Sequence, residues 1–526
     1  MKKVLVVISF LAVALPVFAQ TQMFNSCVEN EGAGIQVTLP STFNTANASL
    51  PDPFLMMGGS RMTSKEQWAQ RRQETLRLLE RTVYGTKPPK PASVTGSVTN
   101  TLITVNVSEN GRTASFTAAV TLPSGTGPFP AVILYGNTGA AAATLRNWGV
   151  ATINFNSAAV GSEQGSRSNK TGAFYTIYGN NSRAGLLVAW AWGVSRIIDV
   201  IEQSGSTIIR PDAIGVTGCS RSGKGAFVAG ALDQRIALTI PMESGTGGTN
   251  IMRGAFADRD PAGGTNGAQS PNSAYGETYW LGDDFSAFTN NPNNLPVDIH
   301  QAIALIAPRG FFVMDKTASS AAQWLGIPSS HRAAIAAAEV YKALGAGGNF
   351  HYMNTPTQMH CSGQASYDTQ LRDFVDKFLH RNKPVGTEPF FTAAAAPSMT
   401  SPVNYINWTT PTLSGELTIG GCGSGPTSIS DKHASGMISA RALNLRAAAA
   451  QNGGINAAFR ASGNGTAVIN LYNLKGGLIA STKIRTVSGM DYSHAFNVDN
   501  LSKGIYVVGL RGGDGRVEQA RVVVPR

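Results

Sequence analysis

Residues 214–231 decide the fold: Ile214-Gly-Val-Thr217 is followed by Gly218-Cys-Ser-Arg-Ser-Gly-Lys-Gly225 and then by Ala226-Phe-Val-Ala-Gly-Ala231. The pattern predicts a strand, a glycine-rich turn and a helix. Gly-x-Ser-x-x-Gly at such a junction is typical of a nucleophile elbow, in which small residues let the backbone turn sharply and expose the Ser220 hydroxyl. Two residues separate Ser220 from Gly223, where the commoner motif has one, so a plain helix N-cap is the alternative.

A serine nucleophile needs a histidine base, and His360 is the best-placed candidate. It lies in a loop between the strand-like segment Phe350–Met353 and a helical pattern at 371–378. Hydrolases of this architecture carry the base between their last strand and last helix. The other histidines of this region fall within a strand or on helices, and we expect them to be structural: His300, His331, His351 and His380.

Two carboxylates compete to orient the base. Glu243 follows the apolar segment Ile236–Met242, the strand expected directly after the elbow helix. Asp315 follows the next apolar segment, Gly310–Met314, which is the more usual position of the acid in this fold. The residues alone leave both open.

Several short motifs recur in order along the first three quarters of the chain: Leu50-Pro-Asp-Pro-Phe54, Tyr84-Gly-Thr-Lys-Pro-Pro89, the elbow at 218–225, Glu243-Ser-Gly245, Ile306-Ala-Pro-Arg-Gly310, Trp324-Leu-Gly326 and His360-Cys361. With these motifs, the region from about 50 to 382 resembles the glucuronoyl esterases. These carbohydrate esterases cleave the ester between glucuronic acid on xylan and alcohols of lignin. The resemblance to fungal-type members implies that the acid follows the strand after the elbow. It therefore favours Glu243 and keeps Asp315 in reserve.

The resemblance also implies roles for polar residues around the elbow. Arg221 would join a backbone N–H in stabilising the oxyanion, and Lys224, one helical turn after the serine, would donate to sugar hydroxyls. Both are cations at a helix N-terminus, where positive charge opposes the helix dipole, so a functional role is favoured over a solvated one. Further glucuronate contacts carried over from the family are Gln269, Glu277 and Trp324.

The four cysteines form two groups. Cys219 and Cys361 each adjoin a proposed catalytic residue, and the fungal-type family implies a disulfide between them that pins the two catalytic loops. Cys27 and Cys422 lie outside the matched core, and whether they pair with each other stays open.

Composition changes along the chain predict five parts. Residues 1–19 have the basic start, apolar run and small-residue end of an export signal, and 20–48 form an N-terminal extension. Residues 49–382 are the catalytic domain, 383–435 a linker rich in Pro, Ser, Thr, Gly and Ala, and 436–526 a C-terminal domain. No later apolar stretch reaches the roughly 20 residues of a membrane span, so we expect a secreted, cell-surface or periplasmic protein. A signal anchor at the N-terminus is the alternative.

Alternating strand and helix patterns predict an α/β-hydrolase fold, a three-layer α/β sandwich. The expected strands are 131–135, 151–156, 214–217, 236–242, 310–314 and 350–353, and the clearest helices 186–201 and 332–344; an antiparallel hairpin at 103–107 and 114–122 opens the sheet. Short strands after 436 predict a small all-β sandwich. It resembles modules for secretion sorting or surface attachment, with carbohydrate binding as the alternative.

Charge and motif content exclude several partners. The net charge is +11, but the basic residues are dispersed and no nucleic-acid-binding motif occurs. Attraction to acidic plant-wall polymers such as glucuronoxylan, or no partner role for the charge, is the better interpretation. No Cys/His cluster has metal-ligand spacing, and we expect neither metal nor cofactor.

These observations together predict an exported serine esterase acting on glucuronoxylan–lignin esters through Ser220, His360 and Glu243. A xylan acetyl or feruloyl esterase is the alternative within the same class. A catalytically silent plant-wall-binding protein is the alternative from another class.

Overall fold

The computed structural model of the chain comprises two compact units, Met1–Gly425 and Pro426–Arg526. In the first unit it describes residues 25–43, 46–205, 207–258, 267–316, 320–356, 359–383, 388–392 and 405–417, and in the second 445–449, 455–460, 465–473, 478–486, 491–496, 504–511 and 517–524. The expected export signal and Cys422 therefore lie outside the described residues.

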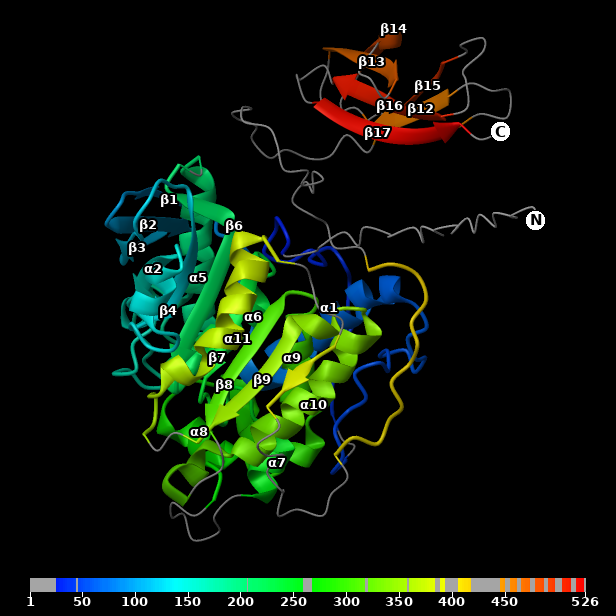
Figure 1. Cartoon of the computed structure of the whole chain (residues 1–526). Helices are drawn as coiled ribbons and strands as arrows, with labels where there is room; N and C mark the ends of the chain where they lie inside the picture. The colour runs from blue at the N-terminus through cyan, green and yellow to red at the C-terminus, as the bar shows by residue number, and fades with distance from the viewer. Residues whose placement is uncertain are drawn as a thin grey trace, which may run out of the picture. The chain divides into compact units, whose positions relative to one another are not determined.

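A ten-stranded sheet with order β1-β2-β3-β5-β4-β6-β7-β8-β9-β10 forms the centre of the first unit (Figure 1). Its strands are β1 (Ser93–Val98), β2 (Leu102–Glu109), β3 (Arg112–Thr121), β4 (Phe129–Tyr135), β5 (Ala151–Phe155), β6 (Ile209–Cys219), β7 (Ile236–Met242), β8 (Gly310–Lys316), β9 (Phe350–Thr355) and β10 (Phe390–Phe391). The strands from β1 through β3 to β5 pair antiparallel, and those from β5 to β10 pair parallel. Parallel pairing brings the carboxyl ends of β6 to β9 to one edge, where ligands bind in open α/β sheets.

Alternating side chains of β4 show why helices cover both faces of the sheet. Ile133 belongs to one hydrophobic cluster, whereas Val132 and Leu134 belong to another. Because successive side chains of a strand point to opposite faces, the two clusters lie on the two sides of the sheet. This arrangement is the three-layer sandwich predicted from the alternating pattern.

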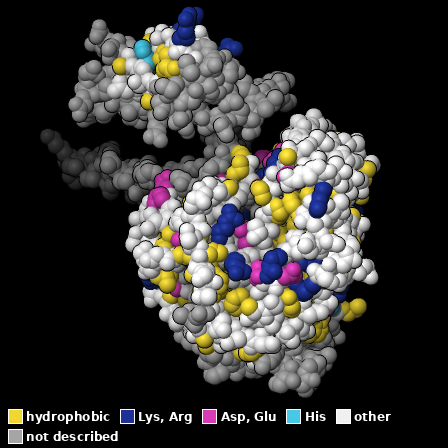
Figure 2. Space-filling view, turned by 180° about the vertical axis from the view of Figure 1, so that it is seen from behind, with side chains coloured by type: hydrophobic (Ala, Val, Ile, Leu, Met, Phe, Trp, Pro, Cys, Tyr) yellow, Lys and Arg dark blue, Asp and Glu magenta, His cyan; other side chains and the backbone are white. Residues whose placement is uncertain are grey.

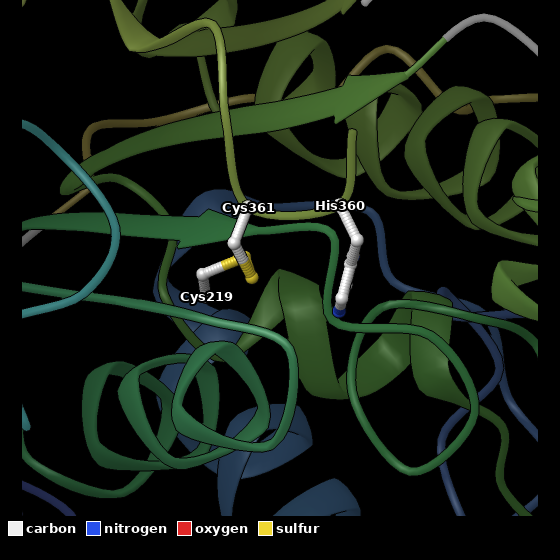
Figure 3. Close-up of side chains that lie close together, drawn as sticks. All are labelled: Cys219, His360 and Cys361. Atoms are coloured by element: carbon white, nitrogen blue, oxygen red, sulfur yellow. A yellow bond between two sulfur atoms is a disulfide. The ribbon is translucent and has the colours of Figure 1, made fainter. Parts of the chain in front are cut away.

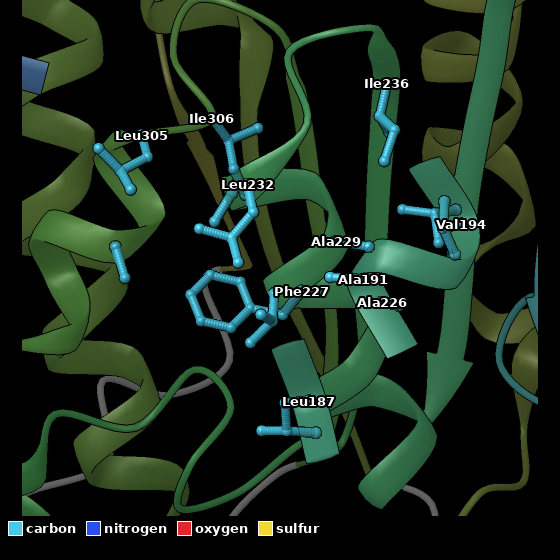
Figure 4. Packing of buried hydrophobic residues seen from close by; sticks show 14 of the residues in the cluster. Leu187, Ala191, Val194, Ala226, Phe227, Ala229, Leu232, Ile236, Leu305 and Ile306 are labelled. Carbon is cyan, nitrogen blue, oxygen red and sulfur yellow. The ribbon is translucent and has the colours of Figure 1, made fainter. Parts of the chain in front are cut away.

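Helices α5 (Leu186–Gln203), α6 (Arg221–Leu232), α9 (Ile299–Ala304) and α10 (Ile327–Ala343) contribute to the larger cluster, and α2 (Ala142–Asn147) and α11 (Asp368–Val375) to the smaller. Figure 4 shows α5 and α6 meeting through Leu187 and Ala191 on one helix and Ala226 and Phe227 on the other. The remaining helices named for this unit are α1 (Trp68–Leu79), α3 (Ser157–Val160), α4 (Ala173–Tyr178), α7 (Met252–Ala257) and α8 (Pro271–Glu277).

Element boundaries differ from expectation at α10, which begins at Ile327 instead of Arg332. Gly326 has φ 62°, in the left-handed region that favours glycine, and proline lies within the first two helical positions. These two features start the helix five residues earlier than its apolar pattern indicates. The strand Ile236–Met242 has the predicted bounds.

Part of the segment expected as a linker packs on the first unit. Residues 390–391 pair with β9, and Ser414 forms a bridge with Ser64. Tyr405 is buried, and its carbonyl accepts a hydrogen bond from Leu50 N at 2.8 Å. The sequence of this segment has no regular apolar pattern, and each of these contacts is made with a residue distant in sequence. The local pattern therefore did not predict them.

The second unit consists of a three-stranded sheet, β11-β12-β15, and a four-stranded sheet, β14-β13-β16-β17, which share one apolar core. The strands are β11 (Arg446–Ala449), β12 (Ile455–Arg460), β13 (Gly465–Asn473), β14 (Leu478–Thr486), β15 (Asp491–Phe496), β16 (Gly504–Arg511) and β17 (Val517–Val524). The small all-β domain is therefore confirmed. Strands β11 and β15 were not expected from the sequence.

The surface and the helices bear on the predicted partners. One face of the first unit carries Lys and Arg side chains next to Asp and Glu side chains, instead of a uniform basic patch (Figure 2). No helix among the described residues has the length and apolar character needed to cross a membrane.

Candidate active site

Ser220 occupies a sharp turn between β6 and α6. Its backbone has φ 59° and ψ −128°, a strained conformation for a residue other than glycine. A Cβ at Gly218 would lie 2.3 Å from the Ser222 carbonyl oxygen, and one at Gly223 would lie 2.6 Å from the Met242 carbonyl oxygen. Close packing therefore requires both glycines of the motif, which a plain helix N-cap does not need.

His360 and Glu243 form a close pair. His360 Nδ1 lies 2.5 Å from Glu243 Oε2, and the same oxygen accepts a hydrogen bond from Cys361 N at 3.1 Å. In the described part of the chain, His360 Nε2 is buried and makes no hydrogen bond. With the Nδ1 proton directed to the carboxylate, Nε2 is the nitrogen that can accept a proton from a serine.

Glu243 is fully buried just beyond the end of β7. Its φ of 44° turns the chain out of the strand conformation, and its N–H donates to the Met314 carbonyl at 2.9 Å. Buried Lys316 places Nζ 3.7 Å from Glu243 Oε2. The two buried side chains thus place a positive group next to the carboxylate that contacts His360.

Asp315, the reserve acid, faces other partners. Its Oδ2 accepts hydrogen bonds from Ser330 Oγ at 2.6 Å and Tyr352 Oη at 3.0 Å. Burial raises the pKa of the Asp315 carboxyl to about 6. Among the hydrogen bonds of the described residues, none joins Asp315 to His360.

A disulfide joins Cys219 and Cys361, with Cα atoms 5.7 Å apart (Figure 3). Ser220 follows one half-cystine and His360 precedes the other, so backbone geometry keeps their Cα atoms within about 13 Å. The two sulfurs and a His360 nitrogen form a tight group, but disulfide sulfurs are not the thiolates that bind metal. Cys27 is also disulfide-bonded, and Cys422 lies outside the described residues.

Arg221 and Lys224 both lie over the Trp280 ring. The Arg221 guanidinium carbon is 5.5 Å from the ring centroid, and Lys224 Nζ is 5.0 Å from it. Buried Lys224 donates to the Ser244 carbonyl at 2.5 Å, and burial lowers the pKa of its ammonium to about 7. The Arg221 N–H, at the first position of α6, has no acceptor within that helix and can serve an oxyanion.

The three expected sugar contacts form a connected rim. Gln269 Nε2 donates to Glu277 Oε2 at 2.7 Å, and Gln269 N donates to the Trp324 carbonyl at 3.0 Å. The Trp324 ring meets the His360 ring edge to face, with centroids 4.7 Å apart. Glu277 Oε1 lies 3.6 Å from Arg221 Nη2. The rim thus extends from the base to the elbow cation.

The sequence did not indicate three residues of this arrangement: Trp280, Lys316 and Glu163, whose carboxylate lies 3.3 Å from Arg221 Nη1. Glu163 and Trp280 lie in irregular segments between elements and belong to no motif. Lys316 follows Asp315 directly, so a charged residue at the end of an apolar strand was its only signal.

An α/β-hydrolase sheet, an elbow serine and a histidine in contact with a buried carboxylate define the class of serine-type carboxylic ester hydrolases. The comparisons with known proteins specify this class further. The family described as "Glucuronyl esterase, fungi" matches residues 105–345. The 4-O-methyl-glucuronoyl methylesterase of Podospora anserina is 41% identical over 378 residues, which cover 71% of this chain and 77% of that protein. The chain belongs to the glucuronoyl esterase family.

Solved structures agree with this assignment. The glucuronoyl esterase catalytic domain from Hypocrea jecorina has 39% sequence identity and a TM-score of 0.63, covering 72% of this chain and 100% of that chain. A glucuronoyl esterase mutant from Sporotrichum thermophile, in complex with methyl 4-O-methyl-beta-D-glucopyranuronate, has 34% identity, a TM-score of 0.63 and the same coverage.

The second unit has its own match. The family described as "Secretion system C-terminal sorting domain" covers residues 451–524. This match indicates secretion or export to the cell surface, and it bears out the sorting interpretation of the C-terminal strands.

Proposed function

We propose that Ser220, His360 and Glu243 form a catalytic triad that hydrolyses the ester between (4-O-methyl-)glucuronic acid of glucuronoxylan and a lignin alcohol. The observation that carries the proposal is the His360 Nδ1–Glu243 Oε2 contact of 2.5 Å, with Nε2 left unpartnered among the described residues. The disulfide that brings the elbow next to the base loop supports it.

The first half of the reaction forms an acyl-enzyme. Ser220 Oγ attacks the C6 carbonyl carbon of the uronate ester while His360 Nε2 takes the hydroxyl proton. Glu243 stabilises the resulting imidazolium and holds its orientation. The Arg221 guanidinium and the N–H at the start of α6 stabilise the negative carbonyl oxygen. Collapse of this intermediate breaks the C6–O bond, and His360 returns the proton to the departing alcohol.

In the second half, water replaces the alcohol. His360 removes a proton from water, which attacks the acyl carbon, and the proton then returns to Ser220 as the uronic acid leaves. Lys224, Gln269, Glu277 and Trp324 supply donors, acceptors and a flat apolar ring for the sugar.

A substrate panel tests the assignment. Wild-type protein is assayed with methyl and benzyl esters of glucuronic acid, an acetylated xylan oligomer and a feruloyl ester. We expect kcat/KM to be highest for the glucuronate esters. A preference for the acetyl or feruloyl ester would replace the substrate assignment, and no turnover of any ester would favour the wall-binding alternative.

A further inference from the structure

We propose that Glu163, fixed by Trp280, is a positioning residue that holds the Arg221 guanidinium in place for catalysis. The proposal rests on the proposed oxyanion role of Arg221. It adds a residue from a loop more than fifty positions earlier in the chain, which no motif of the sequence singled out.

Contacts around Arg221 give the geometric basis. Arg221 Nη1 lies 3.3 Å from both carboxylate oxygens of Glu163. Glu163 Oε1 also accepts a hydrogen bond from Trp280 Nε1 at 2.8 Å. The buried Trp280 side chain thus bonds the carboxylate through its N–H while its ring lies beneath the guanidinium.

The backbone around Glu163 and Trp280 is itself well held. The Gly161 carbonyl accepts from Trp190 Nε1 at 2.7 Å, and Ser162 N donates to the Thr171 carbonyl at 3.0 Å. The Trp280 carbonyl accepts from Leu187 N of helix α5 at 3.2 Å. Rigid supports on both partners let the pair fix the orientation of a third side chain.

Exposure explains why orientation is needed. The Arg221 side chain is 50% exposed, and that of Glu163 is 27% exposed. An ion pair so exposed contributes little to folding stability. A free arginine side chain samples many rotamers, whereas an oxyanion is stabilised best by donors already in place. The contact with Glu163 therefore has its main effect on the reaction.

Glu277, at the end of helix α8, is the second acid close to the guanidinium. Its Oε1 lies 3.6 Å from Arg221 Nη2, beyond hydrogen-bond distance, and its Oε2 is engaged by Gln269. Glu163 provides the closer contact and has no place in the proposed sugar rim. Of the two acids, Glu163 is the dedicated support.

A double-mutant cycle tests the proposal in the full-length enzyme with methyl glucuronate ester as substrate. The variants are Glu163→Gln, Arg221→Met and their combination. Glu163→Gln retains an oxygen that can accept from Trp280. We expect it to lower kcat about 10-fold with KM changed less than about 2-fold, and Arg221→Met to lower kcat about 100-fold. In the Arg221→Met background, Glu163→Gln should cost less than about 2-fold.

Controls separate positioning from charge and from folding. Glu339→Gln removes a carboxylate of similar exposure from an ion pair with Lys342 and should leave kcat unchanged. Glu163→Asp keeps the charge but withdraws it by one methylene, so it should lower kcat as Glu163→Gln does. Thermal unfolding temperatures of all variants should stay near that of the wild type.

Different results would overturn different statements. Unchanged kcat in Glu163→Gln or Glu163→Asp, or an equal further loss in the Arg221→Met background, would overturn the positioning role. A raised kcat in Glu163→Gln would mean that the carboxylate merely weakens the charge of Arg221. Unchanged kcat in Arg221→Met would instead overturn the oxyanion role within the proposed function.

Discussion

Glu243 and Asp315 lie at the carboxyl ends of neighbouring parallel strands and are both buried, yet their surroundings differ. Glu243 lies one residue beyond β7 with φ 44°, and its carboxylate meets His360 and Lys316. Asp315 still belongs to β8, and its carboxylate meets the hydroxyls of Ser330 and Tyr352. The backbone conformation at Glu243 therefore directs its carboxylate to the base. Both acids lie at the same edge of the sheet, so their position along that edge does not explain the difference.

The largest expected effect comes from the nucleophile, which gives the baseline for comparing the two acids. Ser220→Ala removes one half-buried hydroxyl, so kcat should fall by about 10⁴-fold or more while the unfolding temperature stays the same. Steady-state kinetics and thermal unfolding measure both. Near-wild-type turnover would show that Ser220 is not the nucleophile and would contradict the triad with His360 and Glu243.

The Cys219–Cys361 disulfide joins the elbow to the loop that carries His360, the partner of Glu243. It does not involve the strand that carries Asp315. It closes a separation of 142 residues. Changing both Cys219 and Cys361 to alanine should therefore lower the free energy of unfolding by about 4–5 kcal/mol. Turnover should fall as well, because Ser220 and His360 lose their shared constraint.

Thermal unfolding and ester hydrolysis of this double variant provide the readouts. Changing Ser481 to alanine in the second unit is a control that should alter neither. Peptide mapping under non-reducing conditions checks the pairing first. Free thiols at 219 and 361, or pairing of either with Cys27 or Cys422, would contradict the link between the two loops.

The raised pKa of Asp315 predicts a pH-dependent contribution of this acid to folding stability. Its value of about 6, caused by burial, lies above that of an unfolded aspartate, so ionisation destabilises the folded state as pH rises from about 4 to 6. Asp315→Asn keeps an oxygen for Ser330 and Tyr352. It should raise the free energy of unfolding by about 1–2 kcal/mol at pH 7 and change little at pH 4. Denaturant titrations at the two pH values test this, and a loss of stability at pH 7 would contradict it.

The smallest expected effect concerns sugar binding beside the Glu243 pair. Burial lowers the pKa of Lys224 to about 7, so the ammonium is charged below that pH and loses a proton above it. Removing one donor should weaken ester binding about 5- to 10-fold between pH 6 and pH 9. Calorimetry with the Ser220→Ala variant measures Kd without turnover. Changing Lys224 to methionine as well should abolish the pH dependence, and a dependence that survives would assign it to another group.

The sequence predicted the sheet, the elbow and the base loop because each depends on local pattern. The strand Ile236–Met242 and the residues flanking Ser220 are examples. The choice between Glu243 and Asp315 was beyond the residues themselves, since both follow apolar strands of the same sheet. The choice depends on a left-handed backbone conformation at Glu243. No feature of the sequence predicts this conformation for a buried glutamate.

Other parts of the site depend on contacts between segments far apart in the chain. Glu163 reaches Arg221 from a loop with no periodic pattern, and Trp280 supports both. Tyr405 is buried in the first unit although its segment has a composition typical of linkers. Such contacts depend on how distant segments meet in the folded chain, so local sequence patterns do not predict them.

The role of Glu243 in the triad is tested by comparing the two acids in one assay. Glu243→Gln and Asp315→Asn each replace a carboxylate by an amide of the same shape, and kcat/KM is measured with methyl glucuronate ester at pH 7. We expect a loss of about 10³-fold or more for Glu243→Gln and less than about 3-fold for Asp315→Asn. The reverse ranking would move the acid to β8 and contradict the Ser220–His360–Glu243 triad.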